Sequence, residues 1–319
     1  MPGKHWNGRR HRSHFRRFRW KWFILLMISV SLCMFGLVML ISYGTDLIDS
    51  HQTSESLRNV YQGHTEIPLV NTPMHTQVSI TPAPTALPTR FVRSTEPAAK
   101  LQAVMYPDNP KLLVSSRFKA LQKKNRDITG WLTIGNLLDE AVVQRDEVFY
   151  MDHDALGKKN VNGAIFLDSG ISLRTRPYSL ILYGHNMKTG AMFGCLRNFE
   201  KLSFYHRNPF IDFDSKYEEG RYVIFAVGSV SMQSYKREYL DFFALTSEDI
   251  QERREAIDAI KAGSVYTCTI DVQPDDQLLI LITCVEKDED RRVVAARRIR
   301  EGEDDAGLIR QVERSRKRQ

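Results

Sequence analysis

Two short stretches near the end of the chain hold residue types that could perform nucleophilic catalysis. An apolar run, Leu278–Ile282, predicts a buried strand that ends at Thr283-Cys284, and Arg291-Arg292 opens a second strand after a charged loop. A cysteine thiolate is a good nucleophile, and a neighbouring cation stabilises it. Free cysteines are also among the most buried residue types, and most of them are inert. The stretch by itself therefore leaves a catalytic and a core cysteine both open.

The base that a catalytic thiol needs has three candidates within the predicted folded domain. His185 follows a hydrophobic strand, Leu180–Tyr183, and Gly184, and it begins a loop rich in turn-forming residues. A loop at the end of a rigid strand can present a reactive imidazole. His153 and His206 have no comparable setting. We therefore expect His185 to be the base, and a loop histidine bonded to the backbone is the alternative.

The four cysteines do not predict a disulfide framework. Cys33 lies in an apolar N-terminal stretch, which leaves an odd number of thiols in the rest of the chain. At least one of them is then free or pairs with another chain. We expect Cys195 and Cys268 to be small core residues, with a bridge between them as the alternative. The chain has no CxxC and no HxxxH spacing, so the sequence gives no support for structural zinc.

The N-terminus predicts a membrane anchor. Residues 1–22 hold eight Lys or Arg and no acid, and Phe23–Ile41 gives 19 uncharged, mostly apolar residues. A spanning helix needs about 20 such residues, and the positive-inside rule places the basic tail in the cytoplasm and everything after Tyr43 outside. A cleaved signal peptide is the alternative, but its apolar region is usually shorter, and Ile41–Thr45 makes a poor cleavage site. We expect an uncleaved anchor over residues 23–43, in a single-pass protein of the cell membrane.

The positive net charge of the chain comes from this basic N-terminal tail and does not indicate a nucleic-acid surface. The sequence has 45 basic and 38 acidic residues, a net charge of +7. Without the eight basic residues of the tail, 37 basic residues stand against 38 acidic ones. We therefore expect no nucleic-acid partner, whereas the tail itself could contact anionic lipid headgroups.

Composition divides the remaining chain into a stalk, a domain and a tail. Residues 44–105 are rich in Thr, Pro, Ser and Gln, and they predict an extended spacer outside the membrane. Residues 106–300 form one domain of ordinary size, and residues 301–319 are expected to be a charged, solvated tail. The domain is predicted to be mostly β, with a helix at its start and another, capped by Thr246 or Ser247, before the penultimate strand. The expected helices are Lys111–Asn125 and Ser247–Ala262, and the expected strands are Trp131–Ile134, Ala141–Gln144, Ala164–Leu167, Leu180–Tyr183, Tyr222–Val230, Val265–Val272 and the two described first.

Three motifs, in this order along the chain, resemble those of the sortases of Gram-positive bacteria. They are YGHNMKTGAMFG (Tyr183–Gly194), LITC (Leu281–Cys284) and RRVVAAR (Arg291–Arg297). The GHNMK run, the upstream NRDITGWLTI (Asn125–Ile134) and the helix before the penultimate strand are similar to class B of that family. The resemblance covers roughly residues 111–299. It implies a closed, mostly antiparallel β-barrel with peripheral helices.

The resemblance also implies cysteine transpeptidation, which needs neither a metal nor another cofactor. Cys284 would attack the carbonyl of a Thr in the C-terminal sorting signal of a surface protein. His185 would protonate the departing amine and then accept a proton from the incoming one. Arg291 would bind the substrate and stabilise the oxyanion. The acyl-enzyme would be released by an amino group of a peptidoglycan precursor or by a lysine of a pilin subunit.

The family pattern places the arginine role on Arg291, while Arg292 lies on the opposite face of the strand by the two-residue period. Asn186, Thr283 and Arg292 are further candidates for substrate binding. Class B enzymes commonly have LSTC, and Ile282 stands in the position of that serine. The resemblance therefore implies an altered signal preference or a weaker activity.

The sequence also has to be weighed against three alternatives to a wall-anchoring transpeptidase. A class B enzyme could polymerise pilins, and a sortase-like domain could bind sorting signals without turning them over. A papain-like protease is disfavoured, because its cysteine precedes its histidine in the chain. Here His185 comes before Cys284.

Overall fold

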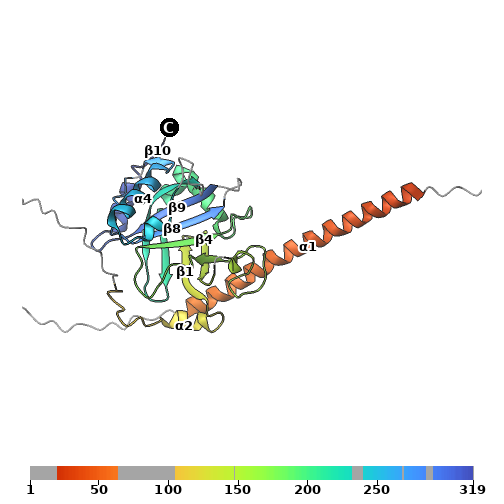
Figure 1. The fold of residues 1–319 in the computed structure, drawn as a ribbon, viewed down its shortest axis with the longest axis horizontal. Coiled ribbons are helices and arrows are strands. Elements are labelled where there is room, and N and C mark those ends of the chain that lie inside the picture. The colour runs from red at the N-terminus through yellow and green to blue at the C-terminus, as the bar shows by residue number, and fades with distance from the viewer. Residues whose placement is uncertain are drawn as a thin grey trace, which may run out of the picture. The chain divides into compact units, whose positions relative to one another are not determined.

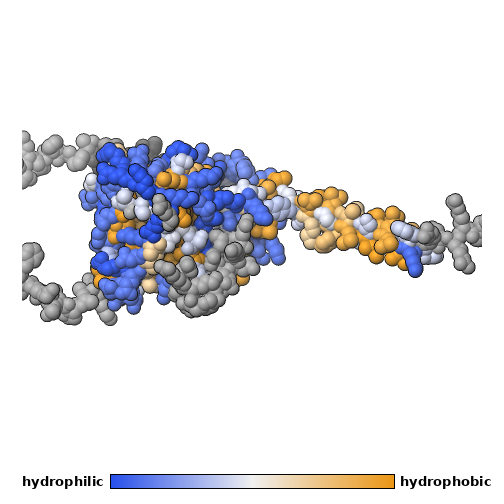
Figure 2. Space-filling view, turned by 90° about the horizontal axis from the view of Figure 1, so that it is seen from above, coloured by the Kyte–Doolittle hydropathy of each residue, from blue (hydrophilic) through white to orange (hydrophobic). Residues whose placement is uncertain are grey.

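The computed structural model describes residues 20–63, 105–146, 148–231, 240–267, 269–284 and 290–318. They belong to two compact units, residues 1–45 and 46–319. Within the first unit lies the beginning of α1 (Trp20–Gly63), whose apolar side chains are exposed and form the orange surface along the helix in Figure 2. An 18-residue window of this helix has a mean hydropathy of 2.8, so its length and composition suit a membrane span.

The second unit begins with the remainder of α1 and contains every strand found in the described residues. From Asp46 to Gly63 the helix buries Ser50, Thr53, Ser54 and Leu57, which follow the i, i+3, i+4, i+7 spacing of one helix face. The predicted extended spacer is therefore wrong for residues 46–63. The buried face is largely polar, so hydropathy does not reveal it. Residues 64–104 of the predicted stalk lie outside the described residues.

Eight strands of this unit close into a barrel in the order β1-β2-β3-β4-β8-β9-β6-β5 (Figure 1). All neighbours are antiparallel except β2–β3 and β4–β8, which are parallel. The predicted closed, mostly antiparallel barrel is confirmed. The strands are β1 (Ile128–Ile134), β2 (Leu138–Val143), β3 (Ile165–Leu167), β4 (Ser179–Gly184), β5 (Phe210–Ser215), β6 (Arg221–Ser231), β8 (Leu278–Cys284) and β9 (Asp290–Arg298).

The core fills the barrel, and β8, between β4 and β9 in the barrel wall, is buried along its apolar run. Every residue of Leu278–Ile282 is at most 2% exposed, which explains the continuous apolar run in the sequence. The expected strand Val265–Val272 is shorter, because only β7 (Tyr266–Thr267) is a strand, and it pairs outside the barrel. The prediction missed β5, whose outward positions carry the acids Asp212 and Asp214.

The two expected helices of the domain are present with corrected bounds. The first, α2, covers Ser116–Gln122, and the Ser115 hydroxyl accepts the amide of Phe118 at its start. The second, α4 (Ile250–Ala262), is capped by Asp249 and not by Thr246 or Ser247. A short α3 (Leu202–Arg207) follows a 3-10 helix over Phe193–Glu200.

The C-terminal residues are folded, so the predicted solvated tail is also wrong. Residues Asp305–Val312 form α5, and β10 (Arg316–Lys317) pairs with β7. Leu308 and Val312 are at most 1% exposed within the core. Two apolar residues one helical turn apart carry this packing, and the surrounding charges hide them in the sequence.

Candidate active site

The register of three neighbouring strands brings the predicted catalytic positions together. In the parallel pair of β4 and β8, Gly184 lies opposite Thr283. His185 directly follows the end of β4, and Cys284 is the last residue of β8, so the two come next to this pair. In the antiparallel pair of β8 and β9, Cys284 lies opposite Arg291. Neighbouring strands are about 4.8 Å apart. The backbone positions of the three residues therefore meet at one end of the barrel.

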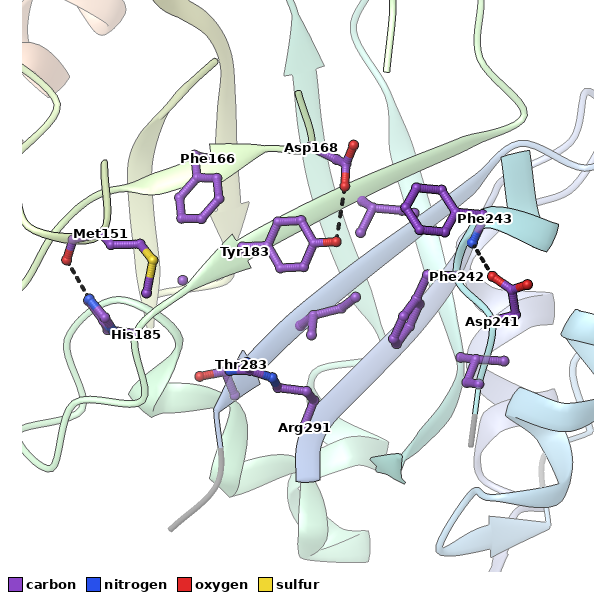
Figure 3. Close-up of a pocket in the computed structure, with 14 residues that line it drawn as sticks. Met151, Phe166, Asp168, Tyr183, His185, Asp241, Phe242, Phe243, Thr283 and Arg291 are labelled. Atoms are coloured by element: carbon purple, nitrogen blue, oxygen red, sulfur yellow. Dashed lines mark hydrogen bonds between the residues drawn. The ribbon is translucent and has the colours of Figure 1, made fainter. Parts of the chain in front are cut away.

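A cavity of about 380 Å³ opens at this end of the barrel (Figure 3). Its walls are mainly aromatic and aliphatic, and its polar groups come from a few side chains. This combination is typical of a ligand site. The lining residues are Met151, Phe166, Asp168, Ile181, Tyr183, Gly184, His185, Leu240, Asp241, Phe242, Phe243, Ile282, Thr283 and Arg291.

The imidazole of His185 is fixed by a backbone carbonyl. Its Nε2 atom lies 2.5 Å from the carbonyl oxygen of Met151, as the dashed line at the left of Figure 3 shows. A carbonyl oxygen only accepts hydrogen bonds, so Nε2 carries a proton and donates it. This bond leaves Nδ1 as the ring nitrogen that can exchange a proton with a reactant.

Arg197 stabilises the loop that carries His185 through hydrogen bonds of its guanidinium. The guanidinium donates to the Met187 carbonyl at 2.6 Å and to the Asn186 side-chain oxygen at 3.2 Å. Gly194 closes the loop so tightly that a Cβ there would lie 2.1 Å from the Met187 carbonyl oxygen. The Asn186 side chain therefore takes part in the loop structure, and Asn186 is not among the residues that line the cavity.

The two adjacent arginines lie in different environments. Arg291 lines the cavity, and its side chain extends toward it beside Thr283 in Figure 3. Arg292 instead forms an ion pair with Glu200, with Nη2 2.7 Å from the carboxylate, and it does not line the cavity. The alternation of side chains along β9 accounts for this difference.

Thr283 and Ile282 also contribute to the cavity, and both are 2% exposed. On the neighbouring strand β4, Tyr183 is paired with Ile282. Its hydroxyl donates to the Asp168 carboxylate at 3.0 Å, which orients the ring along the cavity wall. The other oxygen of this carboxylate, Oδ1, accepts the Gly170 amide at 2.9 Å. Asp168 is 8% exposed, so it places a largely buried acid at the cavity.

Among the described residues of the domain, the thiol of Cys195 and the imidazoles of His153 and His206 do not line the cavity. Cys195 is a free, buried thiol, and burial raises its pKa to about 12, which suits a core residue and not a nucleophile. Because Cys195 is free, the alternative of a bridge to Cys268 is wrong; Cys268 itself lies outside the described residues. His153 Nδ1 lies 2.8 Å from the Phe149 carbonyl, and His206 does not line the cavity.

Sequence reasoning missed the parts of the site that come from loops. Met151 contributes a carbonyl, and any residue type has one, so no sequence signal exists for it. Leu240 and Phe242 come from the segment before α4, together with Phe243, whose side chain is 76% exposed. The adjacent phenylalanines within Leu240–Leu245 were the available signal.

Two relatives place the chain in a family. It is 31% identical over 183 residues to sortase B of Listeria monocytogenes, which covers 56% of this chain and 71% of that protein. It is 29% identical over 191 residues to sortase B of Staphylococcus aureus, covering 58% and 75%. No family model matches the chain.

A solved structure agrees with this assignment. A complex of Staphylococcus aureus sortase B with its substrate superposes with a TM-score of 0.52 at 28% identity, covering 59% of this chain and 87% of that one. The fold is therefore that of a cysteine transpeptidase barrel. The chain belongs to the sortase family and is similar to class B.

Proposed function

We propose that this protein is a membrane-anchored cysteine transpeptidase that cleaves a C-terminal sorting signal after a threonine and transfers the released protein to a cell-wall amine. The strand register carries the proposal, because it brings His185, Cys284 and Arg291 to one end of the barrel beside an open cavity. The family of the relatives supports the reaction class.

The reaction runs in two steps. In the first, the Cys284 thiolate adds to the threonine carbonyl, and the guanidinium of Arg291 stabilises the negative charge that develops on its oxygen. His185 then gives a proton to the departing amine, the C–N bond breaks, and a thioester remains. In the second step an incoming amine attacks the thioester, His185 accepts the proton of that amine, and the thiolate leaves.

The cavity fits an extended peptide with apolar groups. Phe166, Tyr183, Phe242 and Ile282 are among its apolar lining residues, whereas Asp168 offers an acceptor for an N–H group. The position of Arg291 on the cavity side, with Arg292 bound to Glu200, favours Arg291 as the active-site arginine. Thr283 is the substrate-contact candidate that the cavity retains.

A panel of fluorogenic sorting-signal peptides tests this proposal, with signals of the Asn-Pro-x-Thr and Leu-Pro-x-Thr types and with or without an added amine. The full chain in detergent is the right material, since a domain starting at Met105 would lack the packed residues 46–63. We expect cleavage of one signal type, diversion of the product by the amine, and no turnover by Cys284→Ala or His185→Ala.

A sortase-like domain that only binds signals is the second candidate. Ile282, at the position of the usual serine, is the observation that favours it. Binding of a signal peptide without turnover would support this candidate, as would slow alkylation of Cys284. Rapid alkylation together with turnover would exclude it.

We also propose that the part of α1 before Asp46 anchors the protein in the membrane, with residues 1–22 in the cytoplasm. Its exposed apolar side chains and the basic residues that precede it support this topology. Resistance to alkaline carbonate extraction, together with external protease access to the barrel, would bear it out. Release of a shortened soluble chain would instead indicate a cleaved signal sequence.

A further inference from the structure

The second half of α1 is bonded to one particular loop of the barrel domain, the segment 149–163 between β2 and β3. The Thr53 hydroxyl donates to the Asp154 carboxylate at 2.9 Å, and both residues are buried. The Asn160 side-chain amide donates to the Asp46 carbonyl at 2.7 Å. Thr53 and Asp46 thus hold this loop at two points.

The same contacts organise the loop internally. The second oxygen of the Asp154 carboxylate accepts the amides of Leu156 and Lys158, each at 2.9 Å. The Asn160 side-chain oxygen accepts the amide of Asn162 at 2.9 Å. Buried side chains therefore specify the loop conformation. The amides of the turn bind Oδ1 of Asp154, and Thr53 donates to Oδ2, the remaining oxygen.

The other side of the loop meets the active site. The Met151 carbonyl accepts the Nε2 proton of His185, and the Ala164 amide donates to the Tyr150 carbonyl beside it at 2.9 Å. Gly163, with φ +59°, packs so closely that an added Cβ would lie 2.8 Å from the Met151 carbonyl oxygen and 3.0 Å from the His185 ring. The backbone of the loop at Gly163 thus packs directly against the Met151 carbonyl and the imidazole.

We infer that residues 46–63 of α1 position the imidazole of His185 through this loop, with Thr53 as the main positioning residue. The inference rests on the proposed catalytic role of His185. Its physical basis is a hydrogen bond from Thr53 to Asp154, the short backbone segment from Asp154 to Met151, and the hydrogen bond between the Met151 carbonyl and the ring. The helix that continues from the proposed anchor is then part of the support of the catalytic site.

The matched control is Ser54, the next residue on the same buried helix face. Its hydroxyl donates at 2.6 Å to Glu140 of β2, which is not part of the loop. Ser54→Ala therefore removes a partly buried hydrogen bond between α1 and the barrel without touching the route to His185. A general loosening of α1 would affect both variants, whereas positioning affects only Thr53.

The test compares Thr53→Val, Thr53→Ser and Ser54→Ala in the full chain with a peptide that the wild type cleaves. Because small displacements of catalytic groups cost up to about a hundredfold in rate, we expect Thr53→Val to lower kcat by roughly ten- to a hundredfold with KM unchanged. Thr53→Ser restores the hydroxyl and the rate, and Ser54→Ala retains kcat. An equal loss in Ser54→Ala, or no loss in Thr53→Val, would overturn the inference.

A measurement without turnover separates this inference from the proposed function. Nitrogen NMR of ring-labelled histidine reports which ring nitrogen carries the proton, and His185→Gln identifies the signal. We expect a protonated, slowly exchanging Nε2 in the wild type and in Ser54→Ala, and faster exchange in Thr53→Val. An unchanged His185 signal in Thr53→Val would refute positioning, even if the wild type cleaves no peptide.

Discussion

Two sides of the barrel gather polar side chains and use them in opposite ways. On the cavity side, His185, Thr283 and Arg291 line an open space of about 380 Å³. On the side covered by α1, the helix packs against acids of the barrel domain, and its side chains donate hydrogen bonds to them or form an ion pair with them. These acids are Asp139, Glu140, Asp154 and Asp214, which are bonded to Arg58, Ser54, Thr53 and Tyr61 respectively.

The comparison shows that a polar cluster indicates chemistry only where it remains accessible to a ligand. Donors and acceptors under α1 satisfy each other, so they contribute to stability and to the docking of the helix. Substitutions on the cavity side should therefore change turnover and leave the free energy of unfolding nearly constant. Substitutions under α1 should do the reverse, apart from the proposed route through Thr53.

The largest expected effect is on the cavity side. Arg291→Lys keeps the charge but loses the planar fork of donors, so we expect kcat/KM to fall by about 10²–10³-fold with little change in the unfolding temperature. Peptide cleavage and thermal unfolding of the full chain measure the two quantities. Arg292→Lys is the control, and a larger loss of kcat/KM in this variant would move the catalytic role to Arg292.

Glu140 provides a pH-dependent test of the α1 side. Burial, together with the nearby charge of Asp139, raises its pKa to about 7, while the Ser54 hydrogen bond and the charge of Arg58 oppose the increase. The folded protein therefore binds this proton more tightly than the unfolded chain does. Its stability should fall as the pH rises from about 4.5 to about 7, by at most about 3 kcal/mol.

Glu140→Gln removes this titration and keeps an acceptor for Ser54. We expect the unfolding temperature of the variant to rise relative to the wild type between pH 5 and pH 8, with kcat unchanged. A constant difference between the two proteins across this range would show that Glu140 does not titrate there.

Tyr61→Phe tests the same side through a single side-chain hydrogen bond. The Tyr61 ring stacks on Trp131 with centroids 4.4 Å apart, and its hydroxyl donates to the Asp214 carboxylate, whose pKa burial raises. Phenylalanine keeps the stack but leaves the half-buried carboxylate short of a donor. We expect a loss of about 1–2 kcal/mol in the free energy of unfolding, measured by denaturant titration, and normal peptide cleavage.

The smallest effect is expected at the rim of the cavity. Phe243 is 76% exposed, so its removal should leave stability unchanged and raise KM by about fivefold, or roughly 1 kcal/mol of apolar contact with the peptide. Leu113→Ala is the control, since Leu113 is 65% exposed and does not line the cavity. An equal KM in Phe243→Ala and the wild type would remove Phe243 from the binding surface.

Much of the barrel could be predicted because its strands carry local signals. The buried run Leu278–Ile282 and the strand Leu180–Tyr183 are continuous apolar segments, and their bounds differ from β8 and β4 by at most two residues. Residues 46–63 and 305–312 were misread, because few apolar residues mark their buried faces. Their burial depends on partners that lie far away in the sequence, such as Asp154 for Thr53.

The sequence by itself determined the order of His185, Cys284 and Arg291, the apolar N-terminal helix and most of the strands, because residue type and periodicity act locally along the chain. The closed barrel was expected from the resemblance of three motifs to a known family. Only the tertiary structure decided which arginine lines the cavity, which carbonyl holds the His185 ring and which helix supports that loop. Those features depend on strand register and on backbone groups that every residue shares. Local sequence does not encode such long-range pairings; the packing of the whole domain selects them.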